Sequence, residues 1–344
     1  MLVFLVLAST LILSFSGSKS DSLHTADSHG PISIMSDHMH KKGEIMFSYR
    51  FNHMFMNKTM NGTKSLGIDE VMSAPNSSSN DLGRYMNSPI SMGMDMHMFG
   101  AMYAPSDNLT FMVMTSYIEK EMIQQRMQMS GGKRFEVNSS GIGDTRLSSL
   151  VNLFHNKRTK THLGIGLSLP TGSIDKRDNT PVSSDARLGY GMQNGSGTFD
   201  PFFILNNVNS FGRFKLGEQI FFKLPLSGKN SEGYQHGNDY RASFWMSYLW
   251  LNNISTSINI NYKFKGNMEG EDDEMNPRMS PVMDSRNSGY QKINLGFGVN
   301  IINHNEFLRN HRIGIEGIFP VFQNYRGIQM KEVFKVVIGW QYGF

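Results

Sequence analysis

"ISTSININYKFK", residues 254–265, decides the fold because its side chains alternate in character without a break. The even positions carry apolar side chains and one threonine: Ile254, Thr256, Ile258, Ile260, Tyr262 and Phe264. The odd positions carry only serine, asparagine or lysine. Successive side chains of a β-strand point to opposite faces, so this stretch predicts a strand with one greasy and one wet face. A tilted strand crosses a bilayer in about 9–11 residues, and this stretch is long enough to do so.

"VFKVVIGWQYGF", residues 333–344, repeats the pattern with more aromatic side chains. Its even positions hold Phe334, Val336, Ile338, Trp340, Tyr342 and Phe344. Such a row suits a strand that faces lipid, whereas exposure of the same row to water would be unfavourable. The stretch also resembles the C-terminal signal that the outer-membrane barrel assembly machinery reads, which makes that machinery an expected partner.

Alternation of this kind recurs along the chain, and its rhythm predicts the architecture. We count twelve segments, near residues 43–56, 92–104, 109–122, 141–154, 160–170, 198–208, 213–226, 239–251, 254–266, 289–303, 311–323 and 333–344. Connections after even-numbered segments are short, and most of those after odd-numbered segments are long and polar. Short turns at one end and long loops at the other are typical of bacterial outer-membrane barrels. The predicted fold is therefore all-β, a twelve-stranded up-and-down antiparallel transmembrane β-barrel.

Composition excludes several other classes of protein. The mean hydropathy of −0.34 argues against a bundle of membrane-spanning helices. Charged residues make up only 18% of the chain, which is below the roughly 25% of ordinary soluble domains. The net charge of +4 is too small to indicate nucleic-acid binding, and the absence of cysteine removes disulfides and thiolate sites. Residues 1–20 are built like a secretory signal peptide. We expect residues 21–42 to form a periplasmic N-terminal segment and residues 43–344 to form the barrel.

The alternation also predicts which side chains face the lumen. If the apolar rows meet lipid, the partner rows of the later strands form a hydrophilic, basic inner wall. Asp144 and Arg146 share one face, on which a carboxylate and a guanidinium can pair inside a wet barrel. The candidates for solute contact are Met46, Met54, Met56, Met94, Met96, Met98, Met112, Met114, Asp144, Arg146, Arg241, Lys263, Lys292 and Arg312.

Methionine is concentrated in the first part of the chain, where 18 of the 26 lie between Met35 and Met129. In "MGMDMHMFGAM", residues 92–102, methionines occupy alternate positions, and we orient this row inward. That orientation turns Asp95 and His97 outward, which is unfavourable unless they lie near the outer rim. The opposite orientation would make these methionines lipid contacts.

Three interpretations of the methionines stay open. Thioethers are soft ligands that suit Cu(I), and His38, Met39, His40 and His97 add candidate metal ligands, so copper is the one cofactor or cargo that the pattern suggests. Methionine is also an adaptable lining for varied apolar solutes. In the third interpretation, methionine replaces leucine as barrel filling.

Catalysis is not predicted. A phospholipase-like site would need a serine placed beside an outward histidine such as His53 or His97, and no serine has the matching phase. The chain is therefore predicted not to be an enzyme.

Five motifs together carry a family resemblance: "SDHMHKKGEIMFSYRF" (36–51), "MHMFGAMYAPSDNLTFM" (96–112), "SSGIGDTRL" (139–147), "LSLPTGSID" (167–175) and "IGWQYGF" (338–344). The sequence resembles a family of bacterial outer-membrane transporter-like barrels grouped with the meta-pathway of phenol degradation. The resemblance implies an outer-membrane barrel with a transport role and brings no catalytic residues.

The sequence thus predicts an outer-membrane channel of a Gram-negative bacterium for a small solute. A soft metal such as copper is the first solute considered, and small aromatic or apolar compounds are the alternative. A structural or adhesive barrel without transport is the third possibility. The expected partners are outer-membrane lipid and lipopolysaccharide, the assembly machinery and the solute, with no nucleic acid.

Overall fold

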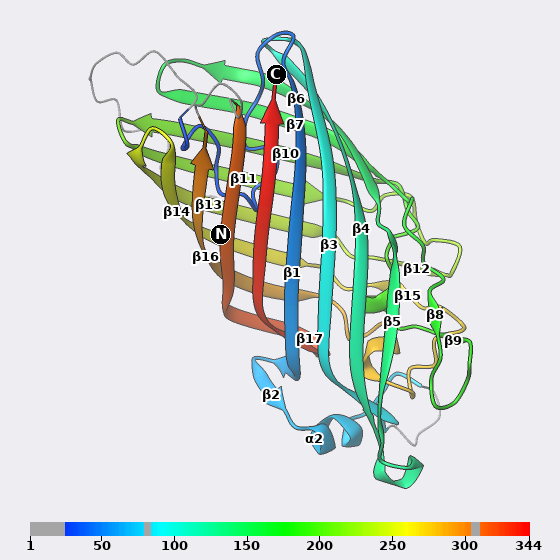
Figure 1. Cartoon of the computed structure of the whole chain (residues 1–344). Helices are drawn as coiled ribbons and strands as arrows, with labels where there is room; N and C mark the ends of the chain where they lie inside the picture. The colour runs from blue at the N-terminus through cyan, green and yellow to red at the C-terminus, as the bar shows by residue number, and fades with distance from the viewer. Residues whose placement is uncertain (1–24, 79–83, 304–309) are drawn as a thin grey trace.

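The computed structural model describes residues 25–78, 84–303 and 310–344, and strands dominate it (Figure 1). The barrel wall consists of β1 (Ile45–Gly62), β3 (Asn87–Ser106), β4 (Leu109–Arg126), β5 (Arg134–Ile142), β6 (Thr145–His155), β7 (Thr159–Leu169), β10 (Asp200–Phe211), β11 (Phe214–Lys223), β13 (Asp239–Leu251), β14 (Ile254–Lys265), β16 (Tyr290–Ile302) and β17 (His311–Gly343). Among the described residues, no helix has the length and apolar character needed to span a membrane. The proposed signal peptide, residues 1–20, lies outside the described residues.

The wall closes on itself through antiparallel pairing. Neighbours along the chain pair in the order β17, β16, β14, β13, β11, β10, β7, β6, β4, β3, β1, and β17 returns to pair with β1. The first part of β17 pairs with β16 up to Tyr325, and the remainder pairs with β1. Its ribbon reverses between these parts (Figure 1), close to Gly327, whose φ of +72° favours glycine. When β17 is counted as two strands and β5 and β6, which both pair with β4, are counted as one, the wall has twelve strands, and the predicted twelve-stranded antiparallel barrel is confirmed.

One predicted strand is divided. The segment expected at 141–154 is β6, and it is preceded by β5, which continues along the same neighbour, β4. The break between them falls at Gly143 and Asp144. There Asp144 accepts hydrogen bonds from Gly172 N at 3.1 Å and from Ser196 N at 2.9 Å and Oγ at 2.7 Å. At this break, the carboxylate of Asp144 therefore binds the long loop between β7 and β10.

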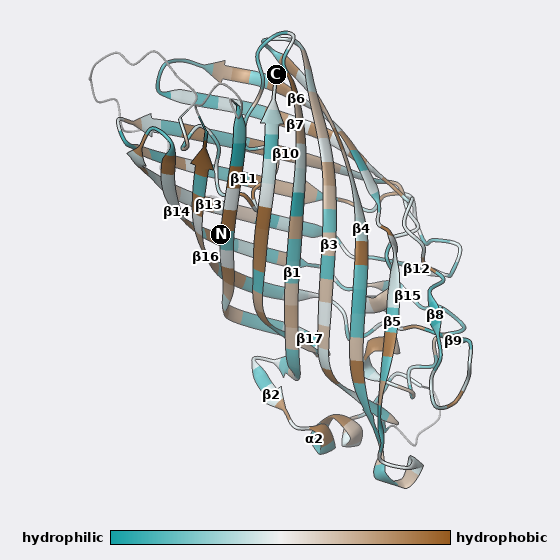
Figure 2. Ribbon diagram, viewed as in Figure 1, coloured by the Kyte–Doolittle hydropathy of each residue, from teal (hydrophilic) through white to brown (hydrophobic). Residues whose placement is uncertain are grey.

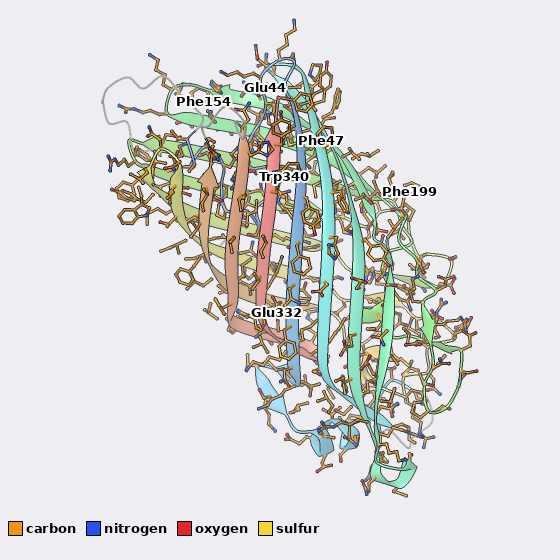
Figure 3. The ribbon with its side chains drawn as sticks, viewed as in Figure 1. Glu44, Phe47, Phe154, Phe199, Glu332 and Trp340 are labelled. Carbon is orange, nitrogen blue, oxygen red and sulfur yellow. The ribbon has the colours of Figure 1, made fainter. Side chains whose placement is uncertain are left out.

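The two faces of the wall differ as the alternation predicts. Phe47, Phe99 and Phe111 are each about half exposed on the outer face. Figure 3 shows Phe47, Phe154 and Trp340 projecting outward toward the end of the barrel that carries the C-terminus. Apolar and polar colours alternate along the strands in Figure 2. This outer band of apolar and aromatic side chains is what a barrel wall presents to lipid.

Trp245 departs from that rule because it points inward from β13 and is 1% exposed. A Cβ built on Gly217 of β11 would lie 2.1 Å from the indole, and one on Gly30 would lie 3.1 Å from it. Both glycines are therefore needed to leave room for this large inward side chain.

The N-terminal segment lies inside the barrel. Residues 25–40, which we call the plug, make hydrogen bonds to inward side chains from strands all around the wall, among them Arg50, His162, Gln219 and Arg312. This position differs from the periplasmic location expected for residues 21–42. The plug has no periodic pattern of its own, and the polar inner wall supplies the partners that hold it.

Long loops fold over the end of the barrel that lies away from the C-terminus (Figure 1). They carry β2 (Lys64–Leu66), α2 (Ile68–Ser73), η2 (Gln128–Ser130), β8 (Arg177–Asp178), β9 (Ala186–Arg187), η3 (Tyr190–Met192), β12 (Tyr234–Gln235), β15 (Glu269–Gly270) and η4 (Pro281–Met283). Buried Arg187 forms ion pairs with Asp272 at 2.8 Å and Glu232 at 2.7 Å, and Tyr85 donates to Asp284 at 2.8 Å. These contacts between loops make an ordered cap at this end of the barrel.

Candidate functional site

The wall holds the plug mainly through the plug's backbone carbonyls. Arg50 Nε donates to Ile32 O at 3.0 Å, and Arg312 Nη2 donates to Gly30 O at 2.6 Å. Further donors are His162 to Ser36 O (2.8 Å), Asn206 to Asp37 O (3.0 Å), Gln219 to Met35 O (2.8 Å), Lys215 to Asp27 O (2.9 Å) and Asn300 to Gly30 O (3.5 Å). A buried carbonyl without a partner is unfavourable, so these donors stabilise the plug inside the lumen.

Side-chain packing adds to this attachment. Ile32 of the plug is 1% exposed and packs with Ile318 and Val337. On the wall, Gly314 and Gly339 face Ile32. A Cβ added to Gly314 would lie 2.9 Å from the Ile32 side chain, and one added to Gly339 would lie 2.5 Å from it. The wall is therefore hollowed at two inward glycines where the plug's isoleucine lies.

A cavity of about 110 Å³ lies between the plug and the inner wall. Its apolar side is formed by Ile34 and Met35 of the plug and by Met112, Met114, Phe202, Ile204, Phe221 and Ile318. Its polar side is formed by Arg146, Gln219, Arg241, Ser243, Asn259, Asn261, Lys263, Asn294 and Lys335. The cavity therefore offers a small solute an apolar surface beside a basic one.

Aromatic rings and cations meet at this cavity. The rings of Phe202 and Phe221 stack with centroids 5.7 Å apart, and the guanidinium of Arg241 lies 4.9 Å from the centre of the Phe221 ring. Asp239 holds the same guanidinium through its Nε at 2.9 Å. A ring held beside a fixed cation is an arrangement that favours aromatic solutes.

The inward orientation of the methionine row agrees with the structure. Met92 and Met102 are about 5% exposed, whereas Phe99 and Tyr103 on the alternate positions are about half exposed. In register, Met94, Met96 and Met98 lie beside Met54, Asn52 and Arg50 of β1. Met98 Sδ lies 3.1 Å from the side-chain nitrogen of Asn52, which is an inward residue.

Most of these methionines are packed against other parts of the chain. Met46, Met102, Met112 and Met114 form a cluster with Leu150, against which Met35, Met39 and Met98 pack. At the capped end, Met92, Met122 and Met330 pack with loop residues Leu188 and Met192, and Met56 lies against them. The methionines thus fill the space between the wall and the plug and between the wall and the cap, as the barrel-filling interpretation proposed.

The predicted charged candidates have separate surroundings. Arg146, Arg241 and Lys263 line the cavity, and Arg312 binds the plug. Asp144 holds the loop described above and forms no ion pair with Arg146 within the described residues. Lys292 instead pairs with Glu332 at 3.1 Å, with its ammonium 4.3 Å from the ring centre of Tyr290. Glu332 is labelled in Figure 3.

The predicted metal ligands are divided between the lumen and the outer wall. His97 faces outward, with Nδ1 2.8 Å from the Tyr49 hydroxyl, and its outward neighbours Asp95 and His53 pair at 2.6 Å. Their polar atoms are therefore satisfied by one another. His38 and His40 lie in the plug, with ring centres 4.9 Å apart, and Met39 between them packs in the methionine cluster. The structure does not bring His97 together with these plug residues.

His29 completes a group that sequence reasoning missed. Its Nδ1 lies 3.1 Å from that of His38, whose Nδ1 lies 2.9 Å from Asp37 Oδ1. Burial lowers the pKa of His29 well below its usual range. Burial alone would raise the pKa of Asp37. The charge and the hydrogen bond of His38 outweigh burial and hold the pKa of Asp37 well below its usual range. Nothing in the spacing of residues 29 and 38 indicated this contact, because the path of the plug creates it.

Comparison with known proteins identifies similar barrels. A family model described as "Putative MetA-pathway of phenol degradation" matches residues 96–307. The COG4313 outer membrane channel from Pseudomonas putida F1 is 12% identical, with 90% of this chain and 98% of that chain covered and a TM-score of 0.59. No curated protein sequence matches the chain.

More distant similarity extends to two further barrels. The P. putida toluene transporter TodX is 10% identical over 88% of this chain and 90% of that chain, with a TM-score of 0.43. The transport unit of the autotransporter AIDA-I from Escherichia coli is 9% identical over 90% and 93%, with a TM-score of 0.47. With the lipid-facing outer band and the COG4313 match, the chain is a β-barrel of the bacterial outer membrane.

Proposed function

Because the chain belongs to the family described as "Putative MetA-pathway of phenol degradation", we propose that it is a channel for small aromatic molecules across the outer membrane. The observation that carries the proposal is the cavity in which the Phe202 and Phe221 rings lie beside basic residues. An aromatic molecule with a polar or acidic substituent would match both sides of that cavity. The proposed transport is passive, and no catalytic step is part of it.

The size of the cavity supports a gated rather than an open path. A cavity of about 150 Å³ lined by apolar side chains holds one benzene molecule. The cavity here measures about 110 Å³ and has the plug as one wall. Passage of an aromatic ring would therefore require displacement of the plug or part of it.

Copper transport has less support in the arrangement of side chains. Met46, Met102, Met112 and Met114 are packed with one another and with Leu150. Of these four, only Met112 and Met114 also line the cavity. We therefore propose an aromatic molecule, and not copper, as the solute. Contacts with lipopolysaccharide and with the assembly machinery stay predictions from the sequence.

Flux measurements with the protein in liposomes test the proposal. We expect benzoate to enter faster than cyclohexanecarboxylate, which has the same charge and a similar size but no aromatic ring. Phe221→Ala should reduce that ratio several-fold, because it removes the ring under Arg241. Phe222→Ala is the matched control, since Phe222 follows on the same strand and so points to the opposite face. Equal flux of both acids through the unmodified protein would contradict the proposal, and no conductance would favour a structural barrel.

A further inference from the structure

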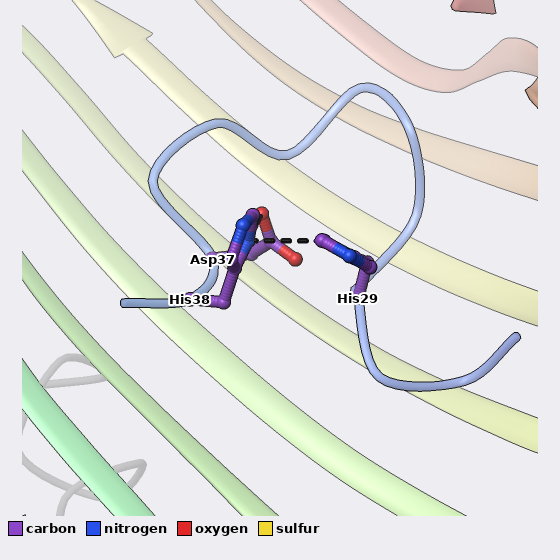
Figure 4. A group of neighbouring side chains, drawn as sticks. All are labelled: His29, Asp37 and His38. Atoms are coloured by element: carbon purple, nitrogen blue, oxygen red, sulfur yellow. Dashed lines mark hydrogen bonds and ion pairs between the residues drawn. The ribbon is translucent and has the colours of Figure 1, made fainter. Parts of the chain in front are cut away.

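Two histidines and one aspartate of the plug converge on one point inside the barrel (Figure 4). A ligand atom from each of His29, Asp37 and His38 lies within 4.8 Å of the other two. The closest separations are 3.1 Å between the two Nδ1 atoms and 2.9 Å between His38 Nδ1 and Asp37 Oδ1. These residues come from the two ends of a loop of the plug, so the plug's own path assembles them.

The two shortest separations are close to those of neighbouring ligands around one ion. Nitrogen and carboxylate ligands bind Zn²⁺ at about 2.0–2.1 Å, so two tetrahedral neighbours lie about 3.4 Å apart. The observed distances are shorter by a few tenths of an ångström. Small rotations of the imidazole rings would open the group to that size without moving the backbone.

The donor atoms of the group also suit a cation. Only one of two facing Nδ1 atoms can carry a proton, so at least one lone pair is directed into the group. The ring of His40 lies with its centre 4.9 Å from that of His38, and its Nε2 is buried without a hydrogen-bond partner. A further nitrogen ligand is therefore close to the three.

The group is supported from behind and has a route to water. Asp37 Oδ2 accepts a hydrogen bond from Gly30 N at 2.6 Å, and Asp37 O accepts one from Asn206. A second cavity, of about 100 Å³, is lined by His29, His40, Glu44 and Arg312, at the end of the barrel where the C-terminal Phe344 also lies. An ion could enter through this cavity, and the bonds to Asp37 would hold its carboxylate in place.

We propose that His29, Asp37 and His38 bind a divalent transition-metal ion of the zinc class that ties the plug into its closed form. The ion joins residue 29 to residues 37–38 and so closes the intervening loop, which carries Ile32 and the carbonyls that the wall binds. The site is a resident lock and not a path for metal transport. Its effect on passage rests on the proposed channel function, whereas binding of the ion does not.

Zinc titration of the full-length mature protein in detergent tests binding. After treatment with EDTA, calorimetry with Zn²⁺ should detect one site per chain, and Co²⁺ should give the intense visible absorption of a tetrahedral complex. His29→Gln and His38→Gln should each weaken Zn²⁺ binding at least 100-fold. Exposed His155 and outward His97 provide matched controls, and their glutamine variants should bind like the unmodified protein. Absence of stoichiometric binding to the unmodified protein, or equal binding by all four variants, would overturn the site.

Conductance in planar bilayers tests the lock, first in the unmodified protein and then in His29→Gln. Zn²⁺ added on the side of the short turns should lower the open probability several-fold, and EDTA should restore it. The same addition of Zn²⁺ should not change the open probability of the His29→Gln variant. Stoichiometric binding with unchanged conductance would overturn the lock while the site stands. Zinc-sensitive conductance without a preference for benzoate would overturn the proposed aromatic solute and leave this inference intact.

Discussion

Ile32 of the plug lies directly against Gly339 of β17, where an added Cβ would stand 2.5 Å from Ile32 Cγ1. The contact joins the first part of the described chain to its last strand. Since Ile32 is buried, neither residue can change its size without a response from the other.

Gly339→Ala should therefore loosen the plug. The added methyl group overpacks the contact, which is typically unfavourable by about 1–3 kcal/mol. We expect more frequent opening in single-channel recordings, and Ile32→Ala in the same chain should reverse part of the effect. Gly93→Ala is the control, because a Cβ there meets no atom within 4 Å. An unchanged open probability in Gly339→Ala would contradict the packing argument.

Arg312→Met should expose the plug to reagents. The substitution keeps an unbranched apolar stem but removes the guanidinium that donates to Gly30 O and Asn300 Oδ1, and each buried acceptor left unpaired is unfavourable by about 1–3 kcal/mol. Because the chain has no cysteine, Ser33→Cys can report on plug position through its rate of thiol labelling. We expect faster labelling in Arg312→Met than in the control Arg213→Met, which changes an exposed arginine. Equal rates would show that Arg312 does not hold the plug.

Asp144→Ala should release the loop between β7 and β10. It removes the acceptor for Gly172 N and for Ser196 N and Oγ, which are three of the bonds that fasten this loop to the wall. Proteases added to intact cells should cut residues 170–199 several-fold faster. Asp185→Ala, which removes an exposed carboxylate 3.7 Å from Arg177, should change the cutting rate little.

Glu332→Ala should destabilise the barrel. It leaves the Lys292 ammonium buried without its carboxylate partner, and breaking such a pair is typically unfavourable by about 3–5 kcal/mol. Urea unfolding in detergent, followed by the mobility shift of folded barrels in gels, should show a lower midpoint. Exposed Glu136→Ala serves as the comparison. Similar midpoints for both variants would mean that the pair is not structurally important.

The wall could be predicted from the sequence because the alternation of apolar and polar side chains in each strand shows which face meets lipid. Residues 254–265 alternate without interruption, residues 333–344 keep an unbroken apolar row on their even positions, and the structure directs both rows outward. Trp245 lies in phase with inward Arg241 on the same strand, but alternation alone does not show how a side chain of this size fits inside the barrel. Its inward position depends on Gly217 of the neighbouring strand and Gly30 of the plug.

The plug and its histidine group were beyond sequence reasoning for a different reason. Residues 25–40 show no period, and their position depends on carbonyls that every residue possesses. His38 and His40 were candidates because they are neighbours in sequence, whereas His29 joins them only after the chain has turned around Ile32. His97 was grouped with them by residue type, although its strand directs it to the other side of the wall.

The inner wall grips its plug by main-chain oxygen atoms, so most of the attachment does not depend on which side chains the plug carries. Particular identities matter at Gly30, which faces Trp245, at Ile32, at Asp27, whose carboxylate lies 3.2 Å from Lys215 Nζ, and in the histidine group. The segment could therefore diverge at its other positions in evolution while still closing the same barrel. An engineer could likewise place a foreign peptide of equal length in this scaffold and keep the shut state, provided that it has a glycine beside Trp245 and an isoleucine opposite Gly339.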